Sequence, residues 1–330
     1  MNYVGSHTLH ALREIDGAPP QPNLVQASLA AGIDPAALQS TALYTGGTDN
    51  NGNSFDPRVN NNAFYHELFQ TAVVSGSYNS LQAKVVGQLG GLTLTGSYSW
   101  SHALDNGSDP IVPGAGNSGL PRNSFDLGPE YGNSDSDVRN RGTVAASYNL
   151  PVGLGAAHLS SGLLGHVLEG IQLSGIQQAQ RGLPFDLRGT VDNLHTSVID
   201  RPQLIGAPYP SNRGKIVAAG KIVGPSAAAF ANAPFGENVA IHRNKFYGPS
   251  FVNTDVVLQK TQTIHEQFKV VLRAESYNVL NHPNMAAPDT VSHNSLTLGS
   301  PTFGVSTSQV GQNDGTTGAR QIQGAIKIIF

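Results

Sequence analysis

Apolar and polar residues alternate in several stretches of the chain, most regularly between Leu92 and Ser101. One set of alternate positions there is apolar, aromatic or glycine, and the other carries only Thr and Ser. Because successive side chains of a strand point to opposite faces, this pattern predicts a strand with one apolar and one hydroxyl-bearing face. A similar stretch over 81–89 precedes it, joined by Gly90-Gly91, which suits the positive φ of a hairpin turn. The sequence therefore predicts a hairpin over 81–101.

The same alternation predicts further strands over 143–150, about 167–180, 252–261 and 267–275. The last residues also alternate, so the chain is expected to end inside a strand on the aromatic Phe330. Polar connections rich in Gly, Pro and Asn occupy 105–137, 184–250 and 282–317, and the links between the other strands are short. We expect seven or eight strands of about ten residues, connected alternately by short and long links.

The first 60 residues give a weaker pattern. Short strand-like pieces are expected at 3–5 and 9–15, and an Ala- and Leu-rich stretch within 22–40 predicts a short helix. Most of 1–60 is therefore expected to be loop, with strands and loops over 60–330. The stretch 46–56 resembles an oxygen-rich cation loop, with Asp49, Asn51, Asn53 and Asp56 as conceivable ligands. Such Asn, Gly and Asp clusters are more often plain turns, which is the reading we favour.

This organisation predicts an all-β fold, an antiparallel transmembrane β-barrel segment with long extracellular loops. Barrels of the outer membrane join their strands by short periplasmic turns and longer external loops. A connection as long as 184–250 without regular structure is uncommon in a compact soluble domain. The alternative is a soluble or secreted sheet with one buried face, and periodicity alone does not separate the two.

The amino-acid composition is also typical of a sheet that has lipid on one side and water on the other. Charged residues make up 12% of the chain, against roughly 25% in typical soluble domains. Hydrophobic residues do not take their place, since they stand at 39%; instead 38 glycines with many Asn, Ser, Thr and Gln fill the difference. A secreted all-β protein shares this composition, so both readings stay open.

Several functional classes find no support. The formal net charge of −3 gives no basic surface for nucleic acid, and the absence of cysteine excludes disulfides and thiolate metal sites. Neither a Gly-x-Ser-x-Gly nor a His-Glu-x-x-His motif occurs, and no phosphate-binding glycine loop is present. We therefore expect no enzyme and no cofactor. The start of the sequence lacks a signal-peptide pattern, so an outer-membrane location predicts that Met1 is a truncation point in a longer chain.

Candidate site residues follow from the faces of the predicted strands. Arg273 and Glu275 share the polar face, which would line the lumen, as a polar ladder or as a substrate contact. Ile326, Ile328 and Phe330 form the apolar row of the terminal strand, a candidate assembly signal. The predicted membrane-facing residues are Leu92, Leu94, Tyr98, Trp100, Val144, Tyr148, Val256, Leu258, Phe268, Val270, Leu272, Ile322, Ile326, Ile328 and Phe330.

Several motifs, in order, resemble the C-terminal barrel of Oar-like TonB-dependent receptors from about residue 60 onward. They are Tyr78-Asn-Ser-Leu-Gln82, Gly96-Ser-Tyr-Ser-Trp-Ser-His-Ala-Leu-Asp-Asn106, Asp137-Val-Arg-Asn-Arg141, Gly182-Leu-Pro-Phe185, Arg273-Ala-Glu-Ser-Tyr-Asn-Val-Leu-Asn-His-Pro-Asn284 and the terminal strand. The sequence departs from the family at Asn140, where His is more frequent, and at Ser276-Tyr277, where aromatics are frequent.

The resemblance implies a receptor in the outer membrane that binds a nutrient with its loops and lumen, and admits it when TonB pulls on a plug. Siderophore, oligosaccharide and peptide all remain open as the ligand. Outer-membrane lipid and the barrel-assembly machinery are the other implied partners. Members carry a carboxypeptidase-regulatory-like domain, a plug and a barrel of 22 strands. The seven or eight strands here are expected to form an open, curved sheet that does not transport on its own. A secreted or surface β-rich binding or adhesive domain is the alternative.

Overall fold

The computed structural model describes most of the chain, and the structural statements below refer to those residues. They are 1–17, 27, 29–32, 47–48, 54–55, 68–108, 120–159, 161–191, 199–209, 222–234, 241–265, 268–288, 294–310 and 318–330.

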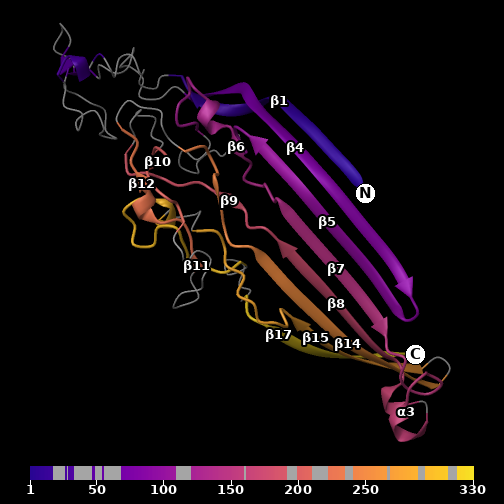
Figure 1. The fold of residues 1–330 in the computed structure, drawn as a ribbon. Helices are drawn as coiled ribbons and strands as arrows, with labels where there is room; N and C mark the ends of the chain where they lie inside the picture. The colour runs from indigo at the N-terminus through magenta and orange to yellow at the C-terminus, as the bar shows by residue number, and fades with distance from the viewer. Residues whose placement is uncertain are drawn as a thin grey trace.

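Eight long strands of the described residues form one antiparallel sheet, in which each strand pairs with the next along the chain (Figure 1). A ninth, β6 (Gly132–Asn133), pairs with the end of one of them. The long strands are β1 (Asn2–Asp16), β4 (Leu68–Leu89), β5 (Leu92–Asp105), β7 (Asn140–Asn149), β8 (Ile171–Gln180), β14 (Phe251–His265), β15 (Phe268–Tyr277) and β17 (Gln321–Ile329). The expected all-β antiparallel fold is confirmed.

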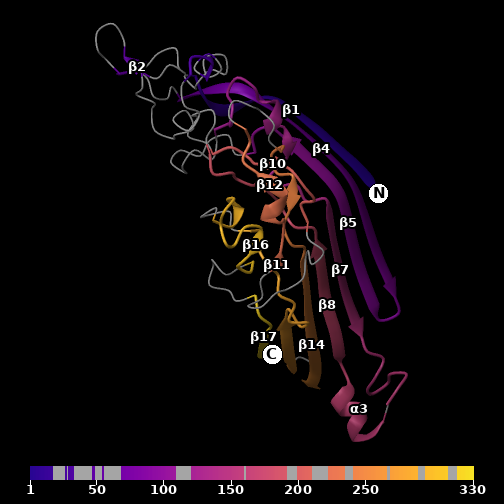
Figure 2. The ribbon, with the colours of Figure 1, turned by 60° about the vertical axis from the view of Figure 1, so that its left-hand side comes forward.

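The sheet is open. Strands β1 and β17 form its two edges, and the N and C termini lie at opposite edges. Figures 1 and 2 show that the sheet is curved, with the loops on its concave side. This agrees with the expected open, curved sheet.

The links alternate as predicted. At one end of the sheet the strands are joined by 90–91, 150–170 and 266–267, and at the other end by the longer links 17–67, 106–139, 181–250 and 278–320. One boundary is corrected. The strand expected from about residue 167 begins at Ile171, because α3 (Gly162–Leu168) precedes it and Gly170, with a φ of 69°, turns the chain from helix to strand.

The expectation for residues 1–60 is also corrected in part. Residues 2–16 form one strand that pairs with β4 along its length, and β4 begins at Leu68, ahead of the expected hairpin. The alternation of β1 is hidden by register shifts between Thr8 and Arg13, since a bulge changes which side chains share a face. The predicted helix and cation loop lie mostly outside the described residues. The exceptions are helical positions at 27 and 29–30 and the short pair β2 (Gly47–Thr48) and β3 (Ser54–Phe55).

The link 181–250, of which 184–250 is expected to be one long external loop, contains regular structure where it is described. Three short ladders hold it and the last link together: β9 with β13, β10 with β12, and β11 with β16. The strands of these ladders are β9 (Pro184–Phe185), β10 (Gln203–Leu204), β11 (Ile222–Val223), β12 (Phe230–Ala231), β13 (Phe246–Tyr247) and β16 (Val305–Ser306). The long links also contain the 3₁₀ turns η1 (Gly128–Glu130), η3 (Ala227–Ala229) and η4 (Asn294–Leu296).

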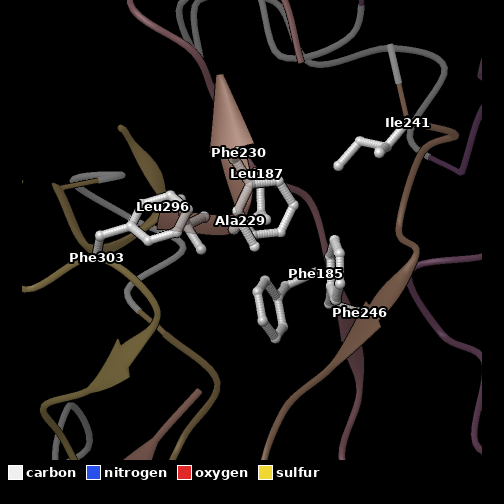
Figure 3. Packing of buried hydrophobic residues seen from close by; sticks show 8 residues of the cluster. All are labelled: Phe185, Leu187, Ala229, Phe230, Ile241, Phe246, Leu296 and Phe303. Atoms are coloured by element: carbon white, nitrogen blue, oxygen red, sulfur yellow. The ribbon is translucent and has the colours of Figure 1, made fainter. Parts of the chain in front are cut away.

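Most of the buried apolar side chains lie in these links and not against the sheet. Phe246 is central among the aromatic rings, with centroids 6.2 Å from Phe185 and 5.6 Å from Phe230 (Figure 3). We call the described residues of 181–250 and 278–320 that pack around this core the loop cluster. Its buried core is Phe185, Leu187, Ala229, Phe230, Ile241, Phe246, Leu296 and Phe303. The burial of apolar side chains therefore lies mainly on the concave side, and the sheet contributes few of them.

Candidate functional site

The register of the sheet brings the predicted membrane-facing residues of the strands onto one face. Residues directly opposite each other in an antiparallel pair share a face. Following such pairs across the sheet leads from Trp100 to Leu81, and separately from Tyr148 through Leu173 to Leu258 and Ala274. Leu272 and Ile326 continue the same row on the last two strands, while Phe330 follows the end of β17. We call this surface the apolar face.

The apolar face is largely uncovered. The exposed fraction is 48% for Trp100, 49% for Leu258 and 74% for Ile326. The same face carries exposed apolar residues that were not singled out beforehand, namely Leu81, Val85, Leu89 and Leu173. A contiguous exposed apolar surface of this extent marks an interaction with lipid or protein, because exposing it to water is unfavourable.

The opposite face is mostly polar, with Ile176 and Ile329 among its exceptions. Hydroxyl pairs such as Ser147–Ser174 (3.0 Å) cross between its strands. Arg273 and Glu275 both lie here and form an ion pair, and Glu275 also accepts hydrogen bonds from Gln323 and from Tyr277 (2.9 Å). The two predicted lumen-facing residues are thus brought together in a polar ladder.

A cavity of about 720 Å³ lies between this polar face and the loop cluster. Gln180 and Phe251, whose positions belong to the polar face, line it, so the polar face is the concave one. One part of the lining is apolar, with Phe185, Leu187, Leu296 and Met285. The other part carries charged side chains, namely Arg13, Arg122, Arg188, Arg201, Arg243, Glu130, Asp135 and Asp186. A cavity of this size and mixed lining suits a small ligand with both apolar and polar groups.

Glu130 is the centre of the buried charge network beside the cavity. The residue is 2% exposed. Arg201 donates to Glu130 Oε2 at 2.7 Å, and Arg13 lies 3.6 Å from the same oxygen. Arg201 Nε also contacts Asp186 at 2.5 Å. Burial by itself would raise the pKa of Glu130, but the positive charges and hydrogen bonds of Arg201, with Arg13 and the Arg122 amide, outweigh it and lower the pKa to about 2.

Because the folded-state pKa of Glu130 is depressed, we expect the loop cluster to lose stability in acid. The contribution, about 3 kcal/mol, is fully present above the ordinary pKa near 4.5 and is lost as the pH falls toward 2. Amide hydrogen exchange of 184–188, corrected for the intrinsic rate, measures it at pH values across this window. The Glu130→Gln variant is the control, and an equally steep loss of protection in it would contradict the assignment.

A hydrogen bond of Tyr247 and an ion-pair contact of Arg243 attach the loop cluster to the rest of the molecule. Asp137, 1% exposed, accepts hydrogen bonds from the Ala103 amide (2.8 Å), Tyr247 (2.6 Å) and Arg139 (3.1 Å). Burial, together with the hydrogen bond to Asp137, raises the pKa of the Tyr247 hydroxyl to about 12. Arg243 pairs with Asp105 and with Asp135 (3.0 Å), and so joins the link 181–250 to the link 106–139.

The sequence reasoning did not find the residues of this network. Arg13 stands in β1, Glu130 in the link 106–139, and Arg201 and Arg243 in the link 181–250. These positions are far apart along the chain, and no spacing rule connects them. The feature that could have pointed to them is that charged residues are rare in this sequence, at 12%. An arginine is therefore unusual here, and a buried one needs a partner of opposite charge.

No helix among the described residues is long and apolar enough to cross a membrane. In the same part of the chain, no cluster of three or more His, Asp or Glu residues is arranged to hold a metal ion.

One protein family, in contrast, matches nearly the whole chain. The family model described as outer membrane beta barrel domain matches residues 1–323. No curated protein and no solved structure matches the chain. The match spans nearly the whole sequence and agrees with the antiparallel sheet, the alternate short and long links and the uncovered apolar face. The chain therefore belongs to the outer membrane beta barrel domain family, which places it in the cell outer membrane.

Proposed function

We propose that the chain forms the wall and external loops of a TonB-dependent receptor of the Oar-like kind, which takes up a nutrient. The observation that carries this proposal is the cavity of about 720 Å³ on the concave side, beneath the loop cluster at the end where the long links gather. A receptor needs a ligand pocket on the external, lumen side of its barrel, and long links are external in outer-membrane barrels. The ordered motifs over 78–106, 137–141, 182–185 and 273–284 support the same family.

In this proposal the apolar face meets the lipid and the polar face, with Arg273 and Glu275, borders the lumen. The row Ile326, Ile328 and Phe330 is the signal that the barrel-assembly machinery reads. TonB acts through a plug, so energy coupling is assigned to a partner domain and not to the described residues. The ligand class stays at siderophore, oligosaccharide or peptide.

Uptake in the host bacterium tests the proposal. The probes are a fluorescently labelled siderophore, oligosaccharide and peptide. We expect deletion of the gene that encodes this chain to abolish the uptake of one of them. Deletion of the TonB gene should abolish the same uptake. Arg188→Gln, in the cavity lining, should reduce that uptake about tenfold, whereas Arg141→Gln, on the polar face outside the lining, should not. Normal uptake with lost surface binding would instead indicate an adhesive domain.

A further inference from the structure

The helix α3 presents uncovered apolar side chains at the end of the sheet opposite to the loop cluster (Figures 1 and 2). The exposed fractions are 81% for Leu163, 61% for Leu164 and 51% for Val167. Residues at i, i+1 and i+4 of a helix lie within one arc, and the buried Gly165 lies outside that arc. Gly165 thus packs against the rest of the protein, and the exposed Leu163, Leu164 and Val167 form an apolar edge of the helix.

Lys260 fixes the side of the sheet on which α3 is held. This lysine pairs across the sheet with Ile171 and with Leu272, so its side chain belongs to the apolar face. Its ammonium group donates to the carbonyl oxygens of His166 (3.2 Å) and Glu169 (3.0 Å). These carbonyls belong to the last turn of α3 and to Glu169, the residue that caps it. Backbone acceptors there lack helical partners, and a cation is favourable. Lys260 therefore ties the C-terminal end of the helix to the edge of the apolar face.

We infer that α3 is an interfacial helix that inserts Leu163, Leu164 and Val167 into the lipid leaflet at the short-link end of the barrel. The inference rests on the proposed contact of the apolar face with lipid, which α3 continues beyond the strand ends. Short links are periplasmic in outer-membrane barrels, so the occupant is the phospholipid surface of the periplasmic leaflet. Amphipathic segments of this kind bury their apolar edge about 5–10 Å into the headgroup boundary.

The arrangement also accounts for a charge in an apolar row. A lysine on a lipid-facing surface is costly unless its ammonium reaches water or a polar partner. Here the helix carbonyls supply that partner, so Lys260 is tolerated beside Leu258 and Leu272.

Because the chain has no cysteine, single cysteine variants allow a direct test. Leu164→Cys is labelled with bimane in isolated outer membranes of the host and quenched by doxyl-stearate with its nitroxide near the carboxyl group, or by aqueous iodide. We expect strong quenching by the nitroxide and little by iodide, with the reverse for His166→Cys, which lies outside the apolar arc. Quenching of Leu164→Cys by iodide alone would overturn the inference, and protection from both quenchers would indicate a protein partner and overturn it as well.

Two controls separate this inference from the proposed function. Leu94→Cys reports on the apolar face itself: if the nitroxide quenches Leu94→Cys but not Leu164→Cys, only the role of α3 fails. If neither position is quenched, the lipid contact of the sheet fails too. In the Leu164→Cys background, Lys260→Met should shift quenching from nitroxide toward iodide, because α3 loses its attachment. Lys260→Arg should retain the original pattern, and an unchanged pattern in Lys260→Met would contradict the role of Lys260.

Discussion

Replacing Arg201 by alanine is expected to destabilise the loop cluster by about 3–5 kcal/mol, the range for breaking a buried ion pair by removing one partner. Arg201 contacts both Glu130 and Asp186. Its loss leaves the carboxylate of Glu130 buried, with the more distant Arg13 beside it. Desolvation of an incompletely compensated carboxylate then opposes the closed arrangement of the links.

Amide hydrogen exchange and limited proteolysis measure this effect, with the signal expected in 184–188 and 241–247 and not in the long strands. The matched control is Arg320→Ala, an exposed arginine of the last link, for which a change within about 0.5 kcal/mol is expected. Replacing Glu130 by Gln together with Arg201→Met should recover part of the loss, because it removes the buried charge as well as its partner. Unchanged protection in Arg201→Ala would show that the network does not stabilise the cluster.

Replacing Leu94 by lysine is expected to destabilise the protein in the membrane, by less than the roughly 2–4 kcal/mol of a lysine at the bilayer midplane, because Leu94 is close to the turn 90–91 at the end of the sheet. Leu94 lies directly opposite Ala146 and Gly87 on the apolar face, and neither residue has a side chain that can accept a hydrogen bond from an ammonium group. The neighbouring Thr95 lies on the polar face, so Thr95→Lys is the matched control and should have little effect.

Reversible unfolding in lipid, followed by denaturant titration, compares the two variants. The comparison is informative because they differ by one position in the same strand and carry the same new side chain. An equal loss of unfolding free energy in the two variants would contradict the lipid contact of the apolar face. So would a protein that is monomeric and stable without detergent and whose stability neither substitution changes.

Local alternation predicted the strands and their faces where the pairing is regular. In 92–101 and 321–330 the period of two survives to the ends of the strand, and the register of β5 and β17 places the predicted residues on one face. The prediction was incomplete in β1 because the bulge between Thr8 and Arg13 interrupts the period. At 167–170 it began the strand too early, inside the end of the helix α3, since a short apolar stretch such as Val167-Leu168 fits either structure.

The sequence by itself thus determined the fold class, the two faces of the sheet and the alternation of short and long links, because strand periodicity and turn residues are local properties of the chain. Only the tertiary structure decided that the links 181–250 and 278–320 pack into a cluster over a cavity, and that Glu130 of the link 106–139 lies between Arg13 and Arg201. It also decided that Lys260 holds α3 at the edge of the apolar face. These contacts join residues far apart in the chain, and their energy depends on burial and geometry that no local pattern records.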